Sequence, residues 1–136
     1  MNVGKIMTRY PLTVNMDRTL KEMETMMQKH KIAHLPVVDE GHVVGIVSDH
    51  DIKAHRSSRA GTSAADGRDN FTLNLKAFQI MTREVIKVSE DTPIAEAIEE
   101  MLKRRIHALP VLSPEGKVMG IVSIFDVAKF CLKTHL

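Results

Sequence analysis

The stretch GIVSDHD, residues 45–51, decides the fold, because a close copy of it, GIVSIFD, stands at residues 120–126. Further motifs recur in the same order along the chain: IMTR at residues 6–9 and 80–83, and LPV at residues 35–37 and 109–111. The copies are 74 residues apart at first, and 75 after one additional residue in the turn at 113–116. Ordered recurrence of several motifs is the signature of an internal repeat, so the chain is a duplicated small unit.

Each copy predicts the element order βαββα. A short β-rich run is followed by a helix-start signal, which is Thr19 with Glu22 as a capping box in the first copy and Asp91-Thr92-Pro93 in the second. Two apolar runs separated by a Gly-containing turn then predict a β-hairpin, and an amphipathic helix closes the copy. The initial strands are expected at 12–14 and 85–88, and the first hairpin at 33–38 and 43–47.

Apolar spacing predicts which helix faces are buried. In the second copy, residues at i, i+3, i+4, i+7 and i+8 predict a buried stripe made of Ile94, Ala97, Ile98, Met101 and Leu102. We expect Cys131 to lie in the core on the apolar face of the last helix. Nine Met against four Phe, one Tyr and no Trp predict a core filled by flexible aliphatic side chains.

Residues 56–70 separate the two copies. They include no large apolar residue and are rich in Ser, Gly, Asp and Arg, which predicts a flexible connector, either disordered or ordered only by a ligand or partner. A lead-in helix carrying Leu73, Leu75, Phe78 and Ile80 is expected after it. The expected organisation is a first repeat at 1–55, the connector at 56–70 and a second repeat at 71–136, which together form one module.

Composition excludes several classes of function. The net charge is only +2, so no basic stripe for nucleic acid is expected. The single Cys cannot form an intramolecular disulfide, and the amino terminus has no apolar run long enough for a signal peptide or spanning helix. We therefore expect a cytoplasmic protein without membrane contact. His30 and His34 are four residues apart, but the predicted helix ends between them, so they need not share a face. His50 and His55 lack the spacing of ligands on one helix, so no metal site is predicted.

Ser48 with Asp51, and Ser123 with Asp126, are the candidate functional residues. Each pair stands where a strand leads into a helix, and the unpaired backbone N–H groups and positive dipole end there favour a phosphate. A carboxylate one helical turn further on could accept hydrogen bonds from both hydroxyls of a ribose. Ser is also a preferred N-cap, so the serines taken alone favour a purely structural role, and it is the Asp at the same offset in both copies that turns the interpretation toward a ligand.

These motifs together resemble a tandem pair of cystathionine-β-synthase (CBS) domains: IMT at the start, LPV on the second strand and GIVS-x-x-D at the end. The resemblance covers nearly the whole chain outside the connector. It implies an α+β fold in which two βαββα repeats pack about a pseudo-twofold axis. It also implies a homodimer and a regulatory module that binds an adenosine-containing ligand in clefts between the repeats. In that family the Ser and Asp of this motif hold phosphate and ribose.

The resemblance also supplies candidates for the rest of the ligand. For the adenine ring these are the second-strand segments, with His34, Pro36, His107 and Pro110, and the first-strand residues Leu12 and Ile86. Without the family, the two prolines would be interpreted as strand-end residues. Basic residues that could contact phosphate are Lys31, Arg105 and His107, although such residues at helix ends are more often simply solvated.

The two sites differ in one adjacent residue. Asp49 beside Ser48 would repel a phosphate, whereas Ile124 beside Ser123 would not, so the second copy is the better predicted anion site. We expect AMP or ADP, with AMP favoured, to bind with its ribose on Asp126.

The predicted function is a sensor of adenine nucleotides (AMP, ADP or ATP) that reports energy state to a separate effector protein and requires no cofactor. The alternative is a constitutive dimerisation or scaffold module that binds no nucleotide. An enzyme is not expected, because no base is matched to Cys131 and no P-loop or dinucleotide-type glycine motif is present.

Overall fold

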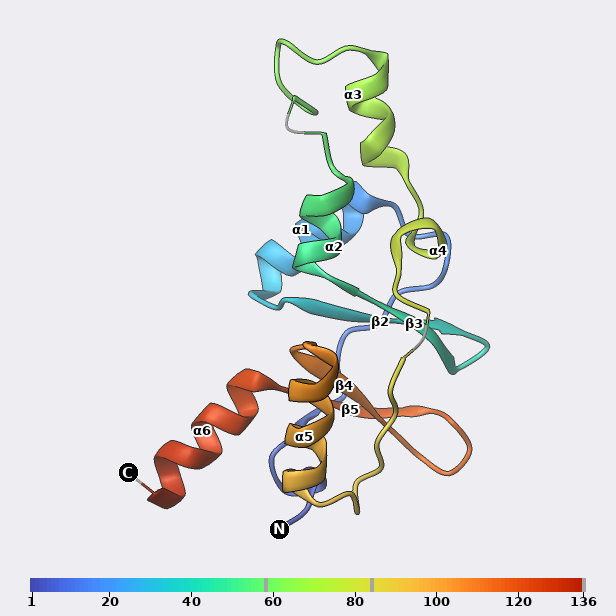
Figure 1. Ribbon diagram of the computed structural model, residues 1–136. Helices are drawn as coiled ribbons and strands as arrows, with labels where there is room; N and C mark the ends of the chain where they lie inside the picture. The colour runs from blue at the N-terminus through green and yellow to red at the C-terminus, as the bar shows by residue number, and fades with distance from the viewer. Residues whose placement is uncertain (58, 84, 136) are drawn as a thin grey trace. The chain divides into compact units, whose positions relative to one another are not determined.

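The computed structural model describes residues 1–57, 59–83 and 85–135, and the chain divides into two compact units. One unit is formed by Leu12–Glu84, and the other by Met1–Pro11 together with Val85–Leu136. Each unit contains an antiparallel hairpin and its own helices, which confirms the α+β class with two repeats (Figure 1).

The unit of residues 12–84 is built on the hairpin of β2 (His34–Asp39) and β3 (His42–Ser48). Helix α1 (Leu20–His30) precedes the hairpin and α2 (Asp49–His55) follows it directly. The later helices are α3 (Gly67–Phe71), the 3-10 turn η2 (Thr72–Asn74) and α4 (Ala77–Ile80). Helices α1, α2 and α4 contact the hairpin strands or one another, and the buried core lies among them.

Local sequence signals set the ends of these elements. Helix α1 begins at the predicted capping box, in which Thr19 and Glu22 exchange hydrogen bonds, and the bond from the Thr19 N–H lowers the pKa of Glu22. The helix ends at His30, because the C-cap residue Lys31 has a left-handed φ of 53° that stops the helical repeat. The hairpin turn uses positive φ at both Glu40 and Gly41, which matches the twist of the adjoining strands.

The second unit repeats this plan. Helix α5 (Ile94–Arg104) precedes β4 (Ala108–Leu112) and β5 (Val118–Ser123), and α6 (Ile124–His135) follows β5. The amino-terminal segment completes the unit with the 3-10 turn η1 (Val3–Lys5) and β1 (Thr8–Arg9), which pairs with β5 to give the sheet order β1-β5-β4.

Each unit is therefore completed by the IMT motif that begins the other sequence copy. Met7 and Thr8 lie against Gly120 of β5, and in the other unit Met81 and Thr82 lie in the same way against Gly45 of β3. Both methionines are buried. Met23, Met27 and Met101 are also buried, which confirms the predicted use of methionine as core filler.

Several predictions about local structure were wrong. The runs at 12–14 and 85–88 do not form full strands, because among the described residues each makes only one bridge, Val14 to Val37 and Val88 to Val111. Leu102 is 69% exposed and Cys131 is exposed, so neither side chain belongs to the core of its unit. The apolar spacing predicted the helices correctly. It did not predict which apolar side chains are buried, because many apolar side chains on a protein surface remain exposed.

The segment predicted as a connector has local order in the structure. The Ser57 hydroxyl donates to Asp69 Oδ1 at 2.6 Å, Arg56 Nε lies 3.0 Å from Glu24 Oε2, and Ala60 is buried. Helix α3 and η2 stand where the connector ends and the lead-in helix was expected to begin, and that helix is reduced to the four residues of α4. The flexibility of residues 56–70 in solution stays a prediction.

We expect Gly120→Ala to lower the free energy of unfolding by about 1–3 kcal/mol, because overpacking forces neighbours to move. An added Cβ would lie 2.7 Å from both the Thr8 carbonyl oxygen and the Met7 sulfur. Gly67→Ala is the control, since no atom lies within 4 Å of the Cβ it would add. Urea denaturation measures both, and equal stability of the two variants would contradict this packing.

The order of the connector can be tested through Asp69, whose pKa is lowered chiefly by the Ser57 hydroxyl. A depressed pKa contributes stability above the unfolded-state value, and this contribution is lost as the pH falls through the folded-state value. We therefore expect Ser57→Ala to destabilise the protein near neutral pH and the difference from wild type to shrink below about pH 4. Ser63→Ala serves as the control in urea titrations, and wild-type behaviour of Ser57→Ala at every pH would indicate a flexible segment.

Candidate functional site

The first candidate site is the junction between β3 and α2. The Ser48 backbone N–H donates to Asp51 Oδ2 at 2.9 Å, and the Asp51 N–H donates to Ser48 Oγ at 3.1 Å. The two residues thus form a reciprocal capping box, which is the structural role considered for the serine. Asp51 Oδ1 accepts no hydrogen bond within the described residues, so half of this carboxylate is available to another molecule.

The second candidate site, at the junction of β5 and α6, has the same box with additional bonds. Ser123 donates to Asp126 Oδ2 from its N–H at 2.8 Å and from its hydroxyl at 3.1 Å, and it accepts from the Asp126 N–H at 3.3 Å. The Thr8 hydroxyl donates to Asp126 Oδ1 at 3.2 Å. Thr8 was not among the predicted site residues. The one signal that could have identified it is its place in the repeated IMT motif.

Strand pairing brings the start of the second strand to each junction. His34 is the register partner of Ser48, and Ala108, next to His107, is the partner of Ser123. The His107 carbonyl accepts the N–H of Ile124 at 2.9 Å, which fixes the first turn of α6 to the start of β4. Of the predicted residues, His34 is half-buried and His107 is exposed, and both lie beside a Ser–Asp pair.

The two prolines lie within strands, so their interpretation as strand-end residues was wrong. Pro36 pairs with Ile46 and Pro110 with Ile121, and both rings are buried. Their carbonyls accept hydrogen bonds from Val14 and Val88, which positions the extended first-strand segments that contain the other two adenine candidates. Those candidates are Leu12, which is 39% exposed, and Ile86, which is half-buried.

Lys31 and Arg105 occupy equivalent positions as C-caps of α1 and α5. Both adopt left-handed backbone conformations, with φ of 53° and 55°, and both side chains are exposed. The backbone N–H groups donate to Met27 and Met101, but neither side chain makes a hydrogen bond or ion pair within the described residues, so both can meet an anion that arrives from solvent. A phosphate contact by either residue stays a prediction.

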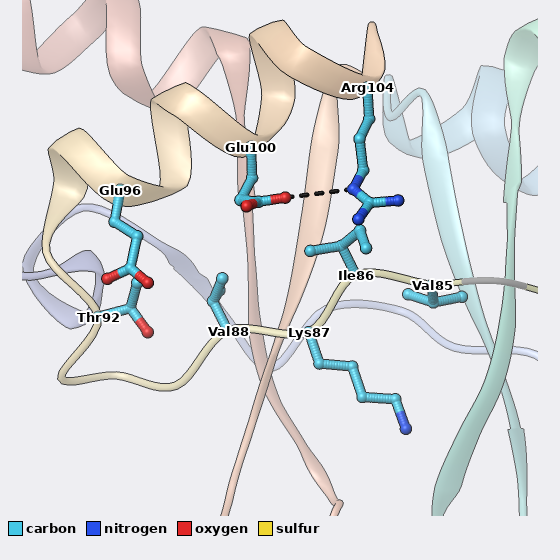
Figure 2. A pocket seen from close by; sticks show the side chains of 8 residues that line it. All are labelled: Val85, Ile86, Lys87, Val88, Thr92, Glu96, Glu100 and Arg104. Carbon is cyan, nitrogen blue, oxygen red and sulfur yellow. Dashed lines mark hydrogen bonds and ion pairs between the residues drawn. The ribbon is translucent and has the colours of Figure 1, made fainter.

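A separate pocket of about 380 Å³ lies between α5 and the segment 85–88 (Figure 2). Ile86 and Val88 point toward the helix, and Arg104 pairs with Glu100 at 3.2 Å across its upper side. Of the residues predicted to bind ligand, Ile86 lines this pocket, whereas Ser123 and Asp126 do not. The pocket is therefore lined by one predicted adenine contact, Ile86, but not by the predicted phosphate and ribose residues of this unit.

The structure offers neither a metal-ligand cluster nor a membrane-spanning helix among the residues it describes. Within residues 1–57, 59–83 and 85–135, no three His, Cys, Asp or Glu side chains are grouped so that they could hold a metal ion. None of the helices in this described part of the chain has both the length and the apolar character needed to cross a lipid bilayer.

Comparison with known sequences identifies the repeat. The CBS domain family matches residues 3–58 and 77–133. An uncharacterised 17.7 kDa protein of Acidianus ambivalens is 33% identical over 134 residues, which cover 98% of this chain and 74% of that protein. Three further relatives from Methanocaldococcus jannaschii are longer, and the chain spans 22%, 21% and 39% of them.

Solved structures agree with this assignment. The CBS domain pair of protein MJ0100, in complex with 5′-methylthioadenosine and S-adenosyl-L-methionine, has a TM-score of 0.80 and 30% identity, covering 98% of this chain and 97% of that one. CBSX2 in complex with AMP has a TM-score of 0.79 and 25% identity, covering 97% and 96%. The family match spans well over half of the chain, and the chain therefore belongs to the CBS domain family, of which it carries two copies.

Proposed function

We propose that this protein is a regulatory module that binds an adenine nucleotide, with AMP as the favoured ligand, at its two serine–carboxylate junctions. The observation that carries the proposal is that Ser48 with Asp51 and Ser123 with Asp126 adopt the same reciprocal geometry at the same place in both units. A separate effector protein reads the bound state, because a ligand shifts an equilibrium only between states that differ in affinity for it.

The helix caps leave some hydrogen-bonding groups at each junction available to a ligand. In the first unit the cap occupies the serine oxygen and one carboxylate oxygen, and Asp51 Oδ1, which accepts no bond from the residues described, can accept a ribose hydroxyl. In the second unit the backbone N–H of Phe125, two residues after Ser123, has no hydrogen-bond partner among the described residues. That free N–H at the first turn of α6 is suited to an anionic oxygen.

The neighbours support an adenosine-containing ligand. Protein MJ0100 and CBSX2 hold 5′-methylthioadenosine, S-adenosyl-L-methionine and AMP, all of which share adenine and ribose. AMP is preferred here because Ile124 adds no charge next to Ser123, and because Arg105 and His107 are exposed near the same end of the unit's strands. His34, Pro36 and Pro110, with Leu12 and Ile86, are the proposed contacts for the ring.

We further propose that the protein is a homodimer that uses α6. This helix projects away from β4, β5 and α5 of its own unit (Figure 1). Its side chains Phe125 and Leu132 are 70% and 60% exposed, and Cys131 is exposed beside them. Large apolar side chains gathered on one exposed helix favour a protein partner, and a second copy of the chain presents the same apolar surface.

Isothermal titration calorimetry with AMP tests the ligand. We expect wild type to bind and Asp126→Ala to weaken binding at the second junction by about tenfold or more, the usual effect of losing a hydrogen bond to a charged group, while the first junction still binds. Glu22→Ala, which breaks the similar capping box of α1, should leave the affinity unchanged and controls for helix destabilisation. If AMP, ADP and ATP at millimolar concentrations neither bind nor raise the melting temperature, the scaffold alternative is favoured.

Sedimentation velocity tests the dimer. We expect wild type to sediment as a dimer and Leu132→Glu to sediment as a monomer, because a charge would be buried in an apolar contact. Thr134→Glu introduces the same charge at an exposed polar position of α6 and should remain dimeric. A monomeric wild type, or a dimeric Leu132→Glu, would exclude α6 as the contact.

A further inference from the structure

The carboxylates of the two junctions differ in how many of their acceptor positions are already occupied. A carboxylate offers about four lone-pair positions for hydrogen bonds. Among the described residues, Asp51 accepts one hydrogen bond, from the Ser48 N–H. Asp126 accepts three, two from Ser123 and one from the Thr8 hydroxyl. Asp51 can therefore receive both hydroxyls of a ribose, whereas Asp126 has room for about one.

We infer that Thr8 is a specificity-determining residue, whose hydroxyl occupies Asp126 and leaves the Ser48–Asp51 junction as the site that selects for an intact ribose diol. This inference rests on the proposed function and adds to it a difference between the two sites. The second junction then holds its nucleotide with less dependence on the 2′-hydroxyl, and the first requires both hydroxyls.

The backbone fixes Thr8 in place for this role. Thr8 pairs with Ile121 in β5, the residue that lies two positions before Ser123 on the same strand. On either side, Met7 lies against Gly120, and Arg9 binds Glu90 at 3.3 Å. The Thr8 side chain is thus held at the end of the strand from which Asp126 follows.

The repeat supplies a matched comparison at Thr82. Thr82 pairs with Ile46, the equivalent of Ile121, and Met81 lies against Gly45. Within the described part of the chain, however, the Thr82 hydroxyl makes no hydrogen bond to Asp51, and Arg83 bonds to the nearby Phe78 carbonyl at 2.9 Å. Equivalent backbone positions therefore carry two different side-chain arrangements, so the difference between the sites lies in the hydroxyl contact.

The experiment compares AMP with 2′-deoxy-AMP by calorimetry in full-length variants that each retain one carboxylate. Asp126→Ala isolates the first junction, and Asp51→Ala isolates the second. We expect the first junction to prefer AMP by about tenfold or more, because one hydrogen bond to a carboxylate is lost with the 2′-hydroxyl. We expect the second junction to prefer AMP by less than about threefold, because the remaining 3′-hydroxyl can fill its one open position.

Removal of the Thr8 hydroxyl is the decisive step. Thr8→Val in the Asp51→Ala background should raise the preference of the second junction for AMP to about tenfold, because an acceptor position is freed. Thr82→Val in the Asp126→Ala background is the control and should leave the preference of the first junction unchanged. The corresponding Asp→Asn backgrounds, which keep an oxygen for the helix cap, serve if an alanine variant melts before titration.

The outcomes separate the two proposals. Equal preferences at the two junctions, or no change on Thr8→Val, would overturn the role of Thr8 while leaving nucleotide binding intact. Failure of wild type to bind AMP at all would overturn the proposed function, and the inference with it. A raised preference in Thr8→Val but not in Thr82→Val supports the assignment.

Discussion

The fold depends on the close approach of two backbones at Gly45 and Gly120. At each glycine an IMT segment lies so near that a Cβ would meet a methionine side chain and a threonine carbonyl at 2.5–3.0 Å. A side chain at either position would push the segment off the strand, and the methionine would then leave the core that it fills. Because the same strands end in Ser48 and Ser123, this contact also sets where the two serine–carboxylate junctions stand.

Features that depend on local chemistry could be predicted from the sequence. The capping box of α1, the turn at Gly41 and the order of elements all follow from residues close together in the chain. The exchange of the IMT segments could not be predicted in this way, because Met7 belongs to one sequence copy and packs in the unit of the other. Proximity along the chain gives no information about which of two similar strands a segment will join.

The part of the candidate site that depends on neighbouring residues could also be predicted from the sequence. The spacing of serine and carboxylate is local, so both pairs were found, together with the possibility that they only cap a helix. The structure shows that the cap is real and that, within the part of the chain it describes, Asp51 Oδ1 accepts no hydrogen bond. The bond from Thr8 to Asp126 joins residues 118 positions apart, so no local pattern predicts it. The tandem repeat also suggested that the two junctions are equivalent, although their side-chain hydrogen bonds differ.

A ligand that binds at Asp126 acts on the same atoms that cap α6. The carboxylate holds the Ser123 N–H, and the serine oxygen holds the Asp126 N–H, so any shift of the side chain toward a ribose changes the first turn of that helix. The helix begins at this turn, and the exposed Leu132 lies near its other end. In the proposed function, ligand occupancy and the apolar surface of α6 are therefore coupled through one short rigid element, which gives a partner protein two states to distinguish.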